Sequence, residues 1–257
     1  MLFAARQSWL LATLCFTLAA AFRSNGIVLA GYLVWGLVAH PFLTHRNISL
    51  PKSLYALLLS TCVFLPFLYH NYTAYLLFCF PPHSTPTPQW CTHTPPSIYT
   101  HVQSTYWNVG FLRYWSPSQI PNFILGAPPL ALLIAFSVSR LVIIAPGVLA
   151  SLRGSPQASV VPDAHALAPT SILPHILHTL FMCTTLLFFS HTQIVLRLAA
   201  ALPTLYWGAA WLLVRDLDAG NHRKTSHGWP WGKIWVWWSA LWGTASLALW
   251  AAFLPPA

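Results

Sequence analysis

The sequence contains almost no negative charge. Of its 257 residues only three are acidic, and glutamate is absent. Charged residues of both signs make up 6% of the chain, against about a quarter in soluble domains. This scarcity excludes an ordinary soluble domain, and the hydrophobic share of 56% indicates a membrane protein.

Clustered positive charge is also missing, although the net charge is +9. The twelve lysines and arginines are scattered between apolar runs, whereas a nucleic-acid binder gathers them on one patch. Their distribution is typical of charges that flank membrane helices. We therefore predict a membrane setting and no nucleic-acid partner.

Soluble-enzyme motifs are absent as well. The sequence has no GxSxG, P-loop or Rossmann glycine pattern. His175 and His178 form the only close helical histidine pair, and no cysteine or carboxylate lies beside them, so no metal site is predicted. Asp216 and Asp218 follow an apolar run among basic residues, and we interpret them as solvated or salt-bridged rather than catalytic.

Long apolar windows dominate the chain. A helix crosses a hydrocarbon core of about 30 Å with roughly 17–25 residues. The candidate windows, seven in all, are 7–22, 26–43, 53–70, 121–147, 171–190, 194–214 and 232–254. The third has a possible continuation through Ala74–Phe80, and the fourth contains Arg140. The fold prediction is an all-α polytopic membrane protein, with 1–257 as a single transmembrane domain and one long loop over 81–120.

The first window allows two interpretations. It follows Arg6 and ends in small residues, as a signal peptide would. Against this, the tetrapeptide Arg23-Ser24-Asn25-Gly26 and a second window follow at once. We favour a membrane span.

Basic residues predict the orientation. One side of the windows holds Arg6, Arg46, Lys52, Arg153, Arg215, Arg223, Lys224 and Lys233, and the other holds Arg23, Arg113 and Arg197. Because cytoplasmic segments carry the excess of positive charge, the first side is predicted to be cytosolic. The 81–120 loop then faces the lumen or exterior.

Two cysteines bracket the proline-rich start of that loop. A Cys79–Cys91 disulfide would suit an oxidising compartment and would contribute about 3 kcal/mol by loop closure. Two unpaired thiols are the alternative. Cys15, Cys62 and Cys183 lie in apolar windows and are interpreted as packing residues.

Two glycosylation sequons begin at Asn47 and Asn71. The charge count places the first in the cytosol. It places the second on the lumenal side, but directly against a span. Neither sequon settles the topology.

The run QSTYWNVGFLRYW, Gln103 to Trp115, interleaves aromatic residues with amides and an arginine. An interfacial aromatic belt would explain the rings alone. The polar residues among them are instead typical of a surface that stacks on sugars and hydrogen-bonds hydroxyls. Arg23 lies on the same predicted side, where it is either a phosphate ligand or a snorkelling arginine at a turn. The predicted substrate-binding residues are Arg23, Asn25, Gln103, Tyr106, Trp107, Asn108, Arg113, Gln119 and Asn122.

Three motifs carry a family resemblance. The run QSTYWNVGFLRYWSPSQIPNFILGAP resembles the hallmark lumenal segment of the GPI mannosyltransferase 2 family. LAAAFRSNGIVLAGYLVW is similar to that family's arginine–asparagine–glycine motif, and FCFPPHSTPTPQWC leading into SIYTHVQ resembles its Phe-Cys…Trp-Cys element. Beyond Pro128 the resemblance is limited to hydropathy and to short pieces such as Tyr206-Trp207.

The resemblance implies a GT-C-type glycosyltransferase bundle of about seven helices in the endoplasmic reticulum membrane. Its implied reaction transfers the second mannose, in α1,6 linkage, from dolichyl-phosphate mannose to the GPI precursor, with no further cofactor. A lumenal carboxylate would take the proton of the acceptor hydroxyl in a single inverting displacement. Family members carry that carboxylate in a large first lumenal loop, which we expect upstream of this chain, making the chain the C-terminal portion of such an enzyme.

Partners are also implied: a lipid-linked mannose donor, a GPI glycolipid acceptor and, in some organisms, an accessory membrane subunit. The alternative function is a non-catalytic membrane subunit or scaffold that retains the fold.

Overall fold

A computed structural model of the chain describes residues 1–80, 88–153, 170–221 and 229–252. These residues form helices and no strand, which confirms the prediction of an all-α membrane protein. They group into two compact units, Met1–Val109 with Ile144–Pro174, and Gly110–Ile143 with His175–Ala257. The single transmembrane domain over 1–257 stays a prediction. Asp163, Arg223 and Lys224, and the side chain of Asp218, lie outside the described residues.

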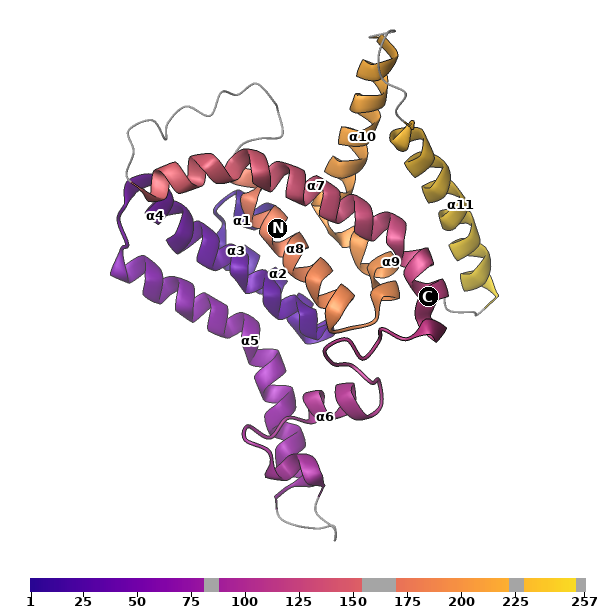
Figure 1. The fold of residues 1–257 in the computed structure, drawn as a ribbon. Coiled ribbons are helices and arrows are strands. Elements are labelled where there is room, and N and C mark those ends of the chain that lie inside the picture. Colours follow the sequence, from indigo (N-terminus) through magenta and orange to yellow (C-terminus); the bar gives the residue numbers. More distant parts are fainter. Residues whose placement is uncertain (81–87, 154–169, 222–228, 253–257) are drawn as a thin grey trace. The chain divides into compact units, whose positions relative to one another are not determined.

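Figure 1 shows the helices, some of which are single turns. The first unit begins with α1 (Leu2–Ala5), α2 (Trp9–Phe22), η1 (Ser24–Leu29), α3 (Ala30–Val34), η2 (Trp35–Ala39), α4 (His40–His45) and α5 (Leu50–Phe78), followed by η3 (Gln89–Thr92) and α6 (Ile98–Thr105). The second contains η4 (Pro117–Gln119), most of α8 (Leu173–Phe188), η7 (Thr192–Ile194), α9 (Val195–Leu198), η8 (Ala199–Ala201), α10 (Pro203–Asn221) and α11 (Trp231–Ala251). The long helix α7 (Ile120–Leu152) has residues in both units, and η6 (Thr170–Ile172) precedes α8.

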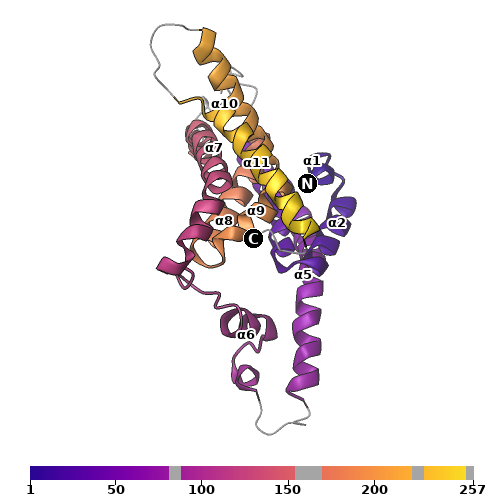
Figure 2. The same cartoon turned by 90° about the vertical axis from the view of Figure 1, so that its right-hand side faces the viewer.

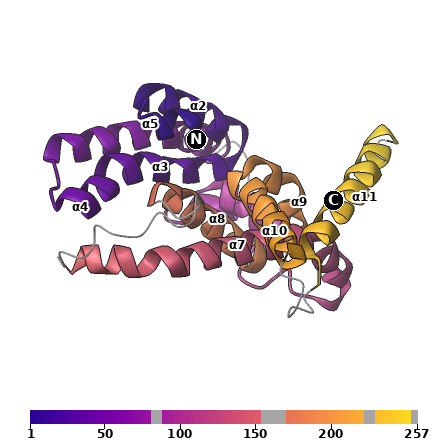
Figure 3. The ribbon, with the colours of Figure 1, turned by 90° about the horizontal axis from the view of Figure 1, so that it is seen from above.

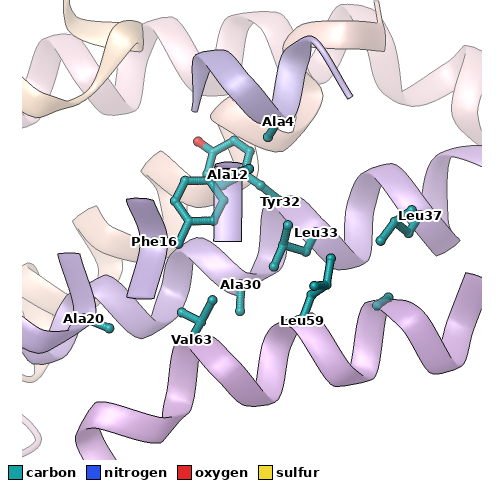
Figure 4. Packing of buried hydrophobic residues seen from close by; sticks show 11 residues of the cluster. Ala4, Ala12, Phe16, Ala20, Ala30, Tyr32, Leu33, Leu37, Leu59 and Val63 are labelled. Atoms are coloured by element: carbon teal, nitrogen blue, oxygen red, sulfur yellow. The ribbon is translucent and has the colours of Figure 1, made fainter. Parts of the chain in front are cut away.

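The core of the first unit lies where α2, α3 and α5 run side by side (Figure 1 and Figure 3). Alanines 12, 20, 30 and 56 are buried there. Lipid offers no hydrophobic driving force for the association of membrane helices, so they associate through close packing. Small side chains allow that close approach. Phe16, Leu33 and Val63 fill the remaining space (Figure 4). The apolar faces of these windows therefore pack on one another.

The second unit is joined by buried polar contacts as well as by packing. The hydroxyls of Thr179 on α8 and Thr204 on α10 lie 2.7 Å apart, and both residues are buried. α10 is in contact with α11 near the start of α11, and the two helices diverge from there (Figure 1). Oδ2 of Asp216 accepts hydrogen bonds from the backbone N–H groups of Gly232 (2.9 Å) and Lys233 (3.2 Å). Asp216 therefore caps the first turn of α11, and it forms no ion pair among the described residues, so the predicted salt bridge is not found there.

Arg140 lies within the apolar length of α7 and is buried. Its guanidinium carbon sits 5.5 Å from the ring centre of Phe136 and 5.8 Å from that of Trp211. Cation–π contacts offset part of the cost of a charge at membrane depth. Arg140 therefore joins α7 to α10 within the second unit.

Three helical segments are long and apolar enough to cross a membrane, namely Ser24–His45, Leu50–Phe78 and Pro117–Leu152. The pair Thr192–Ala201 and Pro203–Leu217, bent by 87°, would make a fourth. The first and fifth windows form shorter apolar helices, α2 and α8. The predicted count of seven spans is therefore not confirmed. The third window does continue as expected, because α5 runs on to Phe78.

Large hydrophobic side chains cover the outer faces of several helices. On α11, Trp237, Leu241 and Trp250 are each about three-quarters exposed, and Leu57 and Leu77 of α5 are also exposed. Soluble monomers rarely expose so much apolar surface. Such faces are expected of helices that contact lipid.

Candidate functional site

The Arg23–Gly26 segment is a sharp turn that leads from the end of α2 into the first residues of η1. Arg23 ends α2 in an extended conformation, and its carbonyl accepts a hydrogen bond from the Gly26 N–H at 2.8 Å. A Cβ on Gly26 would stand 2.5 Å from the backbone nitrogen of Ala20. Only glycine can therefore bring the chain back against the last turn of α2. The Arg23 side chain is left exposed, and Asn25 is half-buried.

The same turn contacts the start of the aromatic ribbon, which we define as residues 103–122. Ser24 Oγ lies 2.8 Å from the hydroxyl of Tyr99 on α6. α6 leads directly into the ribbon and carries its first residue, Gln103. This bond joins segments 75 residues apart in the sequence. The Arg23–Gly26 turn and the start of the ribbon are thus held together within the first unit. The sequence linked these two motifs only through their predicted side of the membrane.

Asn71 of α5 also anchors α6. Its Oδ1 accepts hydrogen bonds from Ser97 Oγ (2.8 Å) and from the Tyr99 N–H (3.3 Å), and its Nδ2 donates to the Phe67 carbonyl (2.9 Å). Ser97 in turn caps α6 by accepting from the Thr100 N–H. α6 accordingly lies beside the C-terminal part of α5 (Figure 1 and Figure 2). The second sequon therefore belongs to a structural network.

A disulfide between Cys79 and Cys91 closes the segment between α5 and η3. Trp90 beside it is buried. The bond joins the end of α5 to the chain that leads into α6. The prolines at 81 and 82 lie outside the described residues.

The ribbon turns back after α6. Asn108 adopts a left-handed backbone conformation (φ 49°), which asparagine tolerates better than most residues. The Val109 N–H then reaches the Gln103 carbonyl at 2.8 Å. Tyr106 and Trp107 on this turn are 75% and 59% exposed. Gln103 is half-buried.

The second half of the ribbon belongs to the second unit and covers the end of α8. The N–H groups of Gly110 and Leu112 donate to the carbonyls of Phe189 (3.1 Å) and Phe188 (2.7 Å). The indole N–H of Trp115 donates to the Leu187 carbonyl at 2.6 Å. The last carbonyls of a helix have no partners within it, so the ribbon satisfies them.

Tyr114 is the buried residue of this half. Its ring stacks on His191 at 4.6 Å and packs against Phe123 at 5.7 Å. Its hydroxyl is buried beside the Asn122 side chain and meets hydrogen-bond geometry to no described group. Burial raises the pKa of the Tyr114 phenol, and the Asn122 side chain partly opposes this shift. The residue was one of the ribbon aromatics, but nothing in its sequence context marked it as buried.

The remaining predicted residues lie in this second half of the ribbon. Asn122 Nδ2 donates to Gln119 Oε1 at 2.7 Å, which fixes one amide against the other. Arg113 is exposed, with the stem of its side chain against Gly110. The nine predicted residues therefore divide between the units: Arg23, Asn25, Gln103, Tyr106, Trp107 and Asn108 in the first, and Arg113, Gln119 and Asn122 in the second.

Sequence reasoning missed the residues that position this candidate site. Asn71 was noted only as a sequon, and Ser97 and Tyr99 only within a family motif. Ser97 carried one usable signal, because serine before an apolar-periodic run is typical of a helix N-cap. No local signal could have paired Ser24 with Tyr99. In the described part of the chain, no three His, Cys, Asp or Glu residues gather as metal ligands would.

Comparisons with known proteins agree with the three motifs. The family described as "Mannosyltransferase (PIG-V)" matches residues 4–257. The "GPI mannosyltransferase 2" of Cryptococcus neoformans is 33% identical over 98% of this chain and 60% of its own length. That of Saccharomyces cerevisiae is 31% identical over 95% of this chain and 51% of its own. The "GPI alpha-1,6-mannosyltransferase 2" of Cricetulus griseus is 32% identical over 80% and 48%.

No solved structure matches the chain. The chain spans about half the length of the curated relatives it matches. The family match covers nearly every residue, including the Arg23 turn and the whole ribbon, and it confirms the resemblance inferred from those motifs. The chain belongs to the PIG-V mannosyltransferase family.

Proposed function

We propose that the protein is a glycosyltransferase of GPI-anchor biosynthesis, which transfers the second mannose in α1,6 linkage from dolichyl-phosphate mannose to the GPI precursor. The observation that carries this proposal is the family match over residues 4–257, together with relatives named for GPI α1,6-mannosyl transfer. Nothing in these comparisons favours a non-catalytic scaffold. The corresponding location is the endoplasmic reticulum membrane, with the ribbon on the lumenal side.

Arg23 suits the lipid phosphate of the donor. Its side chain is exposed at the end of an apolar helix, while its backbone is fixed by the Gly26 turn. Arginine binds phosphate through a planar, charge-assisted fork, and a fixed backbone reduces the entropy lost on binding. We therefore assign the phosphate to Arg23, with Asn25 beside it.

The ribbon suits sugar. Tyr106 and Trp107 present exposed rings in the first unit, and Gln119 and Asn122 present paired amides in the second. Rings stack on the apolar faces of sugars, and amides exchange hydrogen bonds with hydroxyls. Gln103, Asn108 and Arg113 complete the assigned substrate-binding residues. An accessory membrane subunit is part of the proposal, but no described surface is assigned to it.

The proposed chemistry is one inverting displacement at the anomeric carbon. The acceptor hydroxyl attacks, the lipid phosphate leaves, and a carboxylate removes the hydroxyl proton. We assign that carboxylate to no residue of this chain. Asp216 is unsuitable, because both of its described hydrogen bonds hold the start of α11.

The test uses Arg23→Ala in the full-length protein, expressed in cells that lack GPI mannosyltransferase 2. We expect mannosyl transfer to fall about 10- to 100-fold, the effect of losing a charge-assisted bond to phosphate. The one-mannose precursor should accumulate while the protein level stays normal. Arg197→Ala is the control, since it removes another exposed arginine on the same predicted side. Normal transfer by the Arg23 variant would remove Arg23 from the donor site.

A further inference from the structure

A groove in the second unit has no role in the proposed reaction. It has a volume of about 510 Å³ and is lined by parts of α7, α10 and α11. This volume lies within the range of about 300–1,000 Å³ for small-molecule pockets. Its wall is apolar apart from one charged residue, Arg215. In Figure 1, α10 and α11 meet near the start of α11 and diverge from there.

Side-chain size explains why the groove is open. α7 contributes alanines 127, 131 and 135, which recur every four residues and so share one face of the helix. Opposite them stand Trp231, Trp235 and Trp238 of α11, which also share one face. The bulky indoles keep α11 away from α7, and the alanine methyl groups of α7 are too small to fill the space between the two helices. The groove therefore follows from sequence rather than from loose packing.

Arg215 is oriented at this groove. Its guanidinium carbon lies 5.0 Å from the ring centre of Trp211, one turn earlier on α10. This stacking holds the guanidinium while leaving its edge N–H groups available. The neighbouring carboxylate of Asp216 is turned to the backbone of Gly232 and Lys233, and no carboxylate among the described side chains pairs with Arg215.

The position of Arg215 identifies the kind of ligand. It belongs to the side of the membrane that its excess of lysine and arginine predicts to be cytosolic, opposite Arg23. The cytosolic leaflet is the one that carries anionic phospholipids, and each basic residue near it contributes about 1 kcal/mol of attraction. An apolar groove with an arginine at this side matches acyl chains and a phosphate headgroup.

We propose that the groove between α7, α10 and α11 is a binding site for an anionic phospholipid, whose acyl chain packs on the tryptophans and whose headgroup binds Arg215. The proposal does not rest on mannosyl transfer, because none of its residues belongs to the proposed active site. A bound lipid of this kind would fill the groove that α7 leaves open and so support the pairing of α10 with α11.

The experiment measures quenching of tryptophan fluorescence by lipids brominated on their acyl chains. The full chain is reconstituted in phosphatidylcholine vesicles that contain increasing fractions of brominated phosphatidylserine or brominated phosphatidylcholine. We expect phosphatidylserine to quench at a lower fraction. Arg215→Gln should raise the fraction needed for half-maximal quenching by phosphatidylserine about fivefold and leave the phosphatidylcholine curve unchanged.

Arg46→Gln is the matched control. Arg46 is also exposed on the predicted cytosolic side and stacks on an aromatic ring one turn earlier, 5.5 Å from the centre of Phe42. It lines no part of the groove. This variant should quench like the unchanged protein.

A second variant tests the groove itself. Ala131→Phe places a ring in the space opposite the indoles and should abolish the quenching that is selective for phosphatidylserine, with helix content verified by circular dichroism. Equal quenching by the two lipids in the unchanged protein would overturn the proposal, as would equal effects of Arg215→Gln and Arg46→Gln. Two competition results would also overturn it. The first is displacement of brominated phosphatidylserine by inorganic phosphate, and the second is displacement by dolichyl phosphate that is more effective than displacement by unbrominated phosphatidylserine.

Discussion

The two halves of the aromatic ribbon are anchored by different chemistry. In the first unit, α6 is held by side chains, with Asn71 bonding Ser97 and the Tyr99 backbone while Ser24 contacts the Tyr99 hydroxyl. In the second unit, backbone N–H groups of Gly110 and Leu112 donate to carbonyls that end α8. Side-chain bonds depend on residue identity, and backbone bonds hardly do. Substitutions should therefore disturb the first half much more than the second.

The difference also bears on function. Tyr106 and Trp107 lie in the half held by side chains, and Arg23 precedes Ser24, which contacts the Tyr99 hydroxyl in the same unit. In the proposed function Arg23 binds a phosphate, which requires accurate placement of its side chain, and the Ser24–Tyr99 bond beside it contributes to that placement. The second half presents Gln119 and Asn122, which fix each other through one bond. The two halves can therefore be separated by mutation.

The largest expected effect on stability comes from Gly26→Ala, which disrupts the turn that positions Arg23. The new Cβ would lie 2.5 Å from the Ala20 nitrogen, and backbone cannot yield as a flexible side chain can. We expect a loss of about 3 kcal/mol in the free energy of unfolding, at the upper end of overpacking costs. Thermal unfolding in detergent measures it.

Gly31→Ala is the control for this substitution. Nothing lies within 4 Å of the Cβ it would add, and the residue is exposed in α3. Its melting temperature should stay the same or rise slightly, since alanine favours helix. Equal destabilisation by both variants would mean that the close approach at Gly26 has no energetic weight.

The next largest effect is expected for Asn71→Leu. It removes the acceptor shared by Ser97 and Tyr99 and the donor to Phe67, and leaves a backbone N–H without its partner. The expected cost is about 2 kcal/mol. Amide hydrogen exchange over 98–105 should accelerate, because α6 loses its attachment to α5.

Thr73→Ala separates this network from glycosylation. It destroys the same sequon, but Thr73 Oγ1 bonds only carbonyls of its own helix, those of Tyr69 and His70. We expect its exchange pattern to match the unchanged protein. Endoglycosidase treatment should leave the mobility of the protein unchanged, since both ends of the Asn71 amide are already bonded. If Thr73→Ala reproduced the effect of Asn71→Leu, a glycan rather than the network would explain both.

Local properties of the sequence predicted a large share of this arrangement. The length of an apolar run is read directly from the chain, so the windows 26–43, 53–70 and 121–147 each fall within a helical segment able to span a membrane. The interleaving of rings, amides and arginine likewise distinguished residues 103–122, whose role as a substrate surface stays a prediction. Neither the length of an apolar run nor the composition of a short segment depends on contacts between distant residues.

Contacts between distant segments could not be predicted in this way. Asn71 was noted as a sequon because Thr73 follows it. Its amide oxygen instead accepts a hydrogen bond from Ser97, the N-cap residue of α6, which lies 26 residues further along the chain. The ribbon read as one continuous surface, yet Val109 and Gly110 belong to different units. The window 7–22 became the 14-residue helix α2, because the chain turns at Gln7, whose φ is 58°.

A smaller effect is expected in the second half of the ribbon. Trp115→Phe keeps an aromatic ring against Phe188 and Phe123 but removes the indole N–H that bonds the Leu187 carbonyl. The backbone bonds of Gly110 and Leu112 remain, so the loss should be about 1 kcal/mol. In thermal unfolding, the melting temperature of this variant should lie between those of Asn71→Leu and Trp237→Phe. The second is the control, because the Trp237 side chain is 76% exposed. A loss as large as that of Asn71→Leu would contradict the contrast between the two halves.

The smallest effect is expected for Tyr114→Phe at neutral pH. Its hydroxyl is buried beside the Asn122 side chain without good hydrogen-bond geometry, so losing this weak contact and relieving a poorly satisfied hydroxyl should nearly cancel, and stability should change by less than about 0.5 kcal/mol. At alkaline pH the variant should become the more stable protein. Burial raises the pKa of the Tyr114 phenol above its ordinary value of about 10, so the unfolded chain loses this proton first as the pH rises. The native protein then loses stability above that pH, and the phenylalanine variant lacks this contribution. Melting temperatures measured across the alkaline range would show it, and parallel curves for the two proteins would mean that Tyr114 reaches solvent.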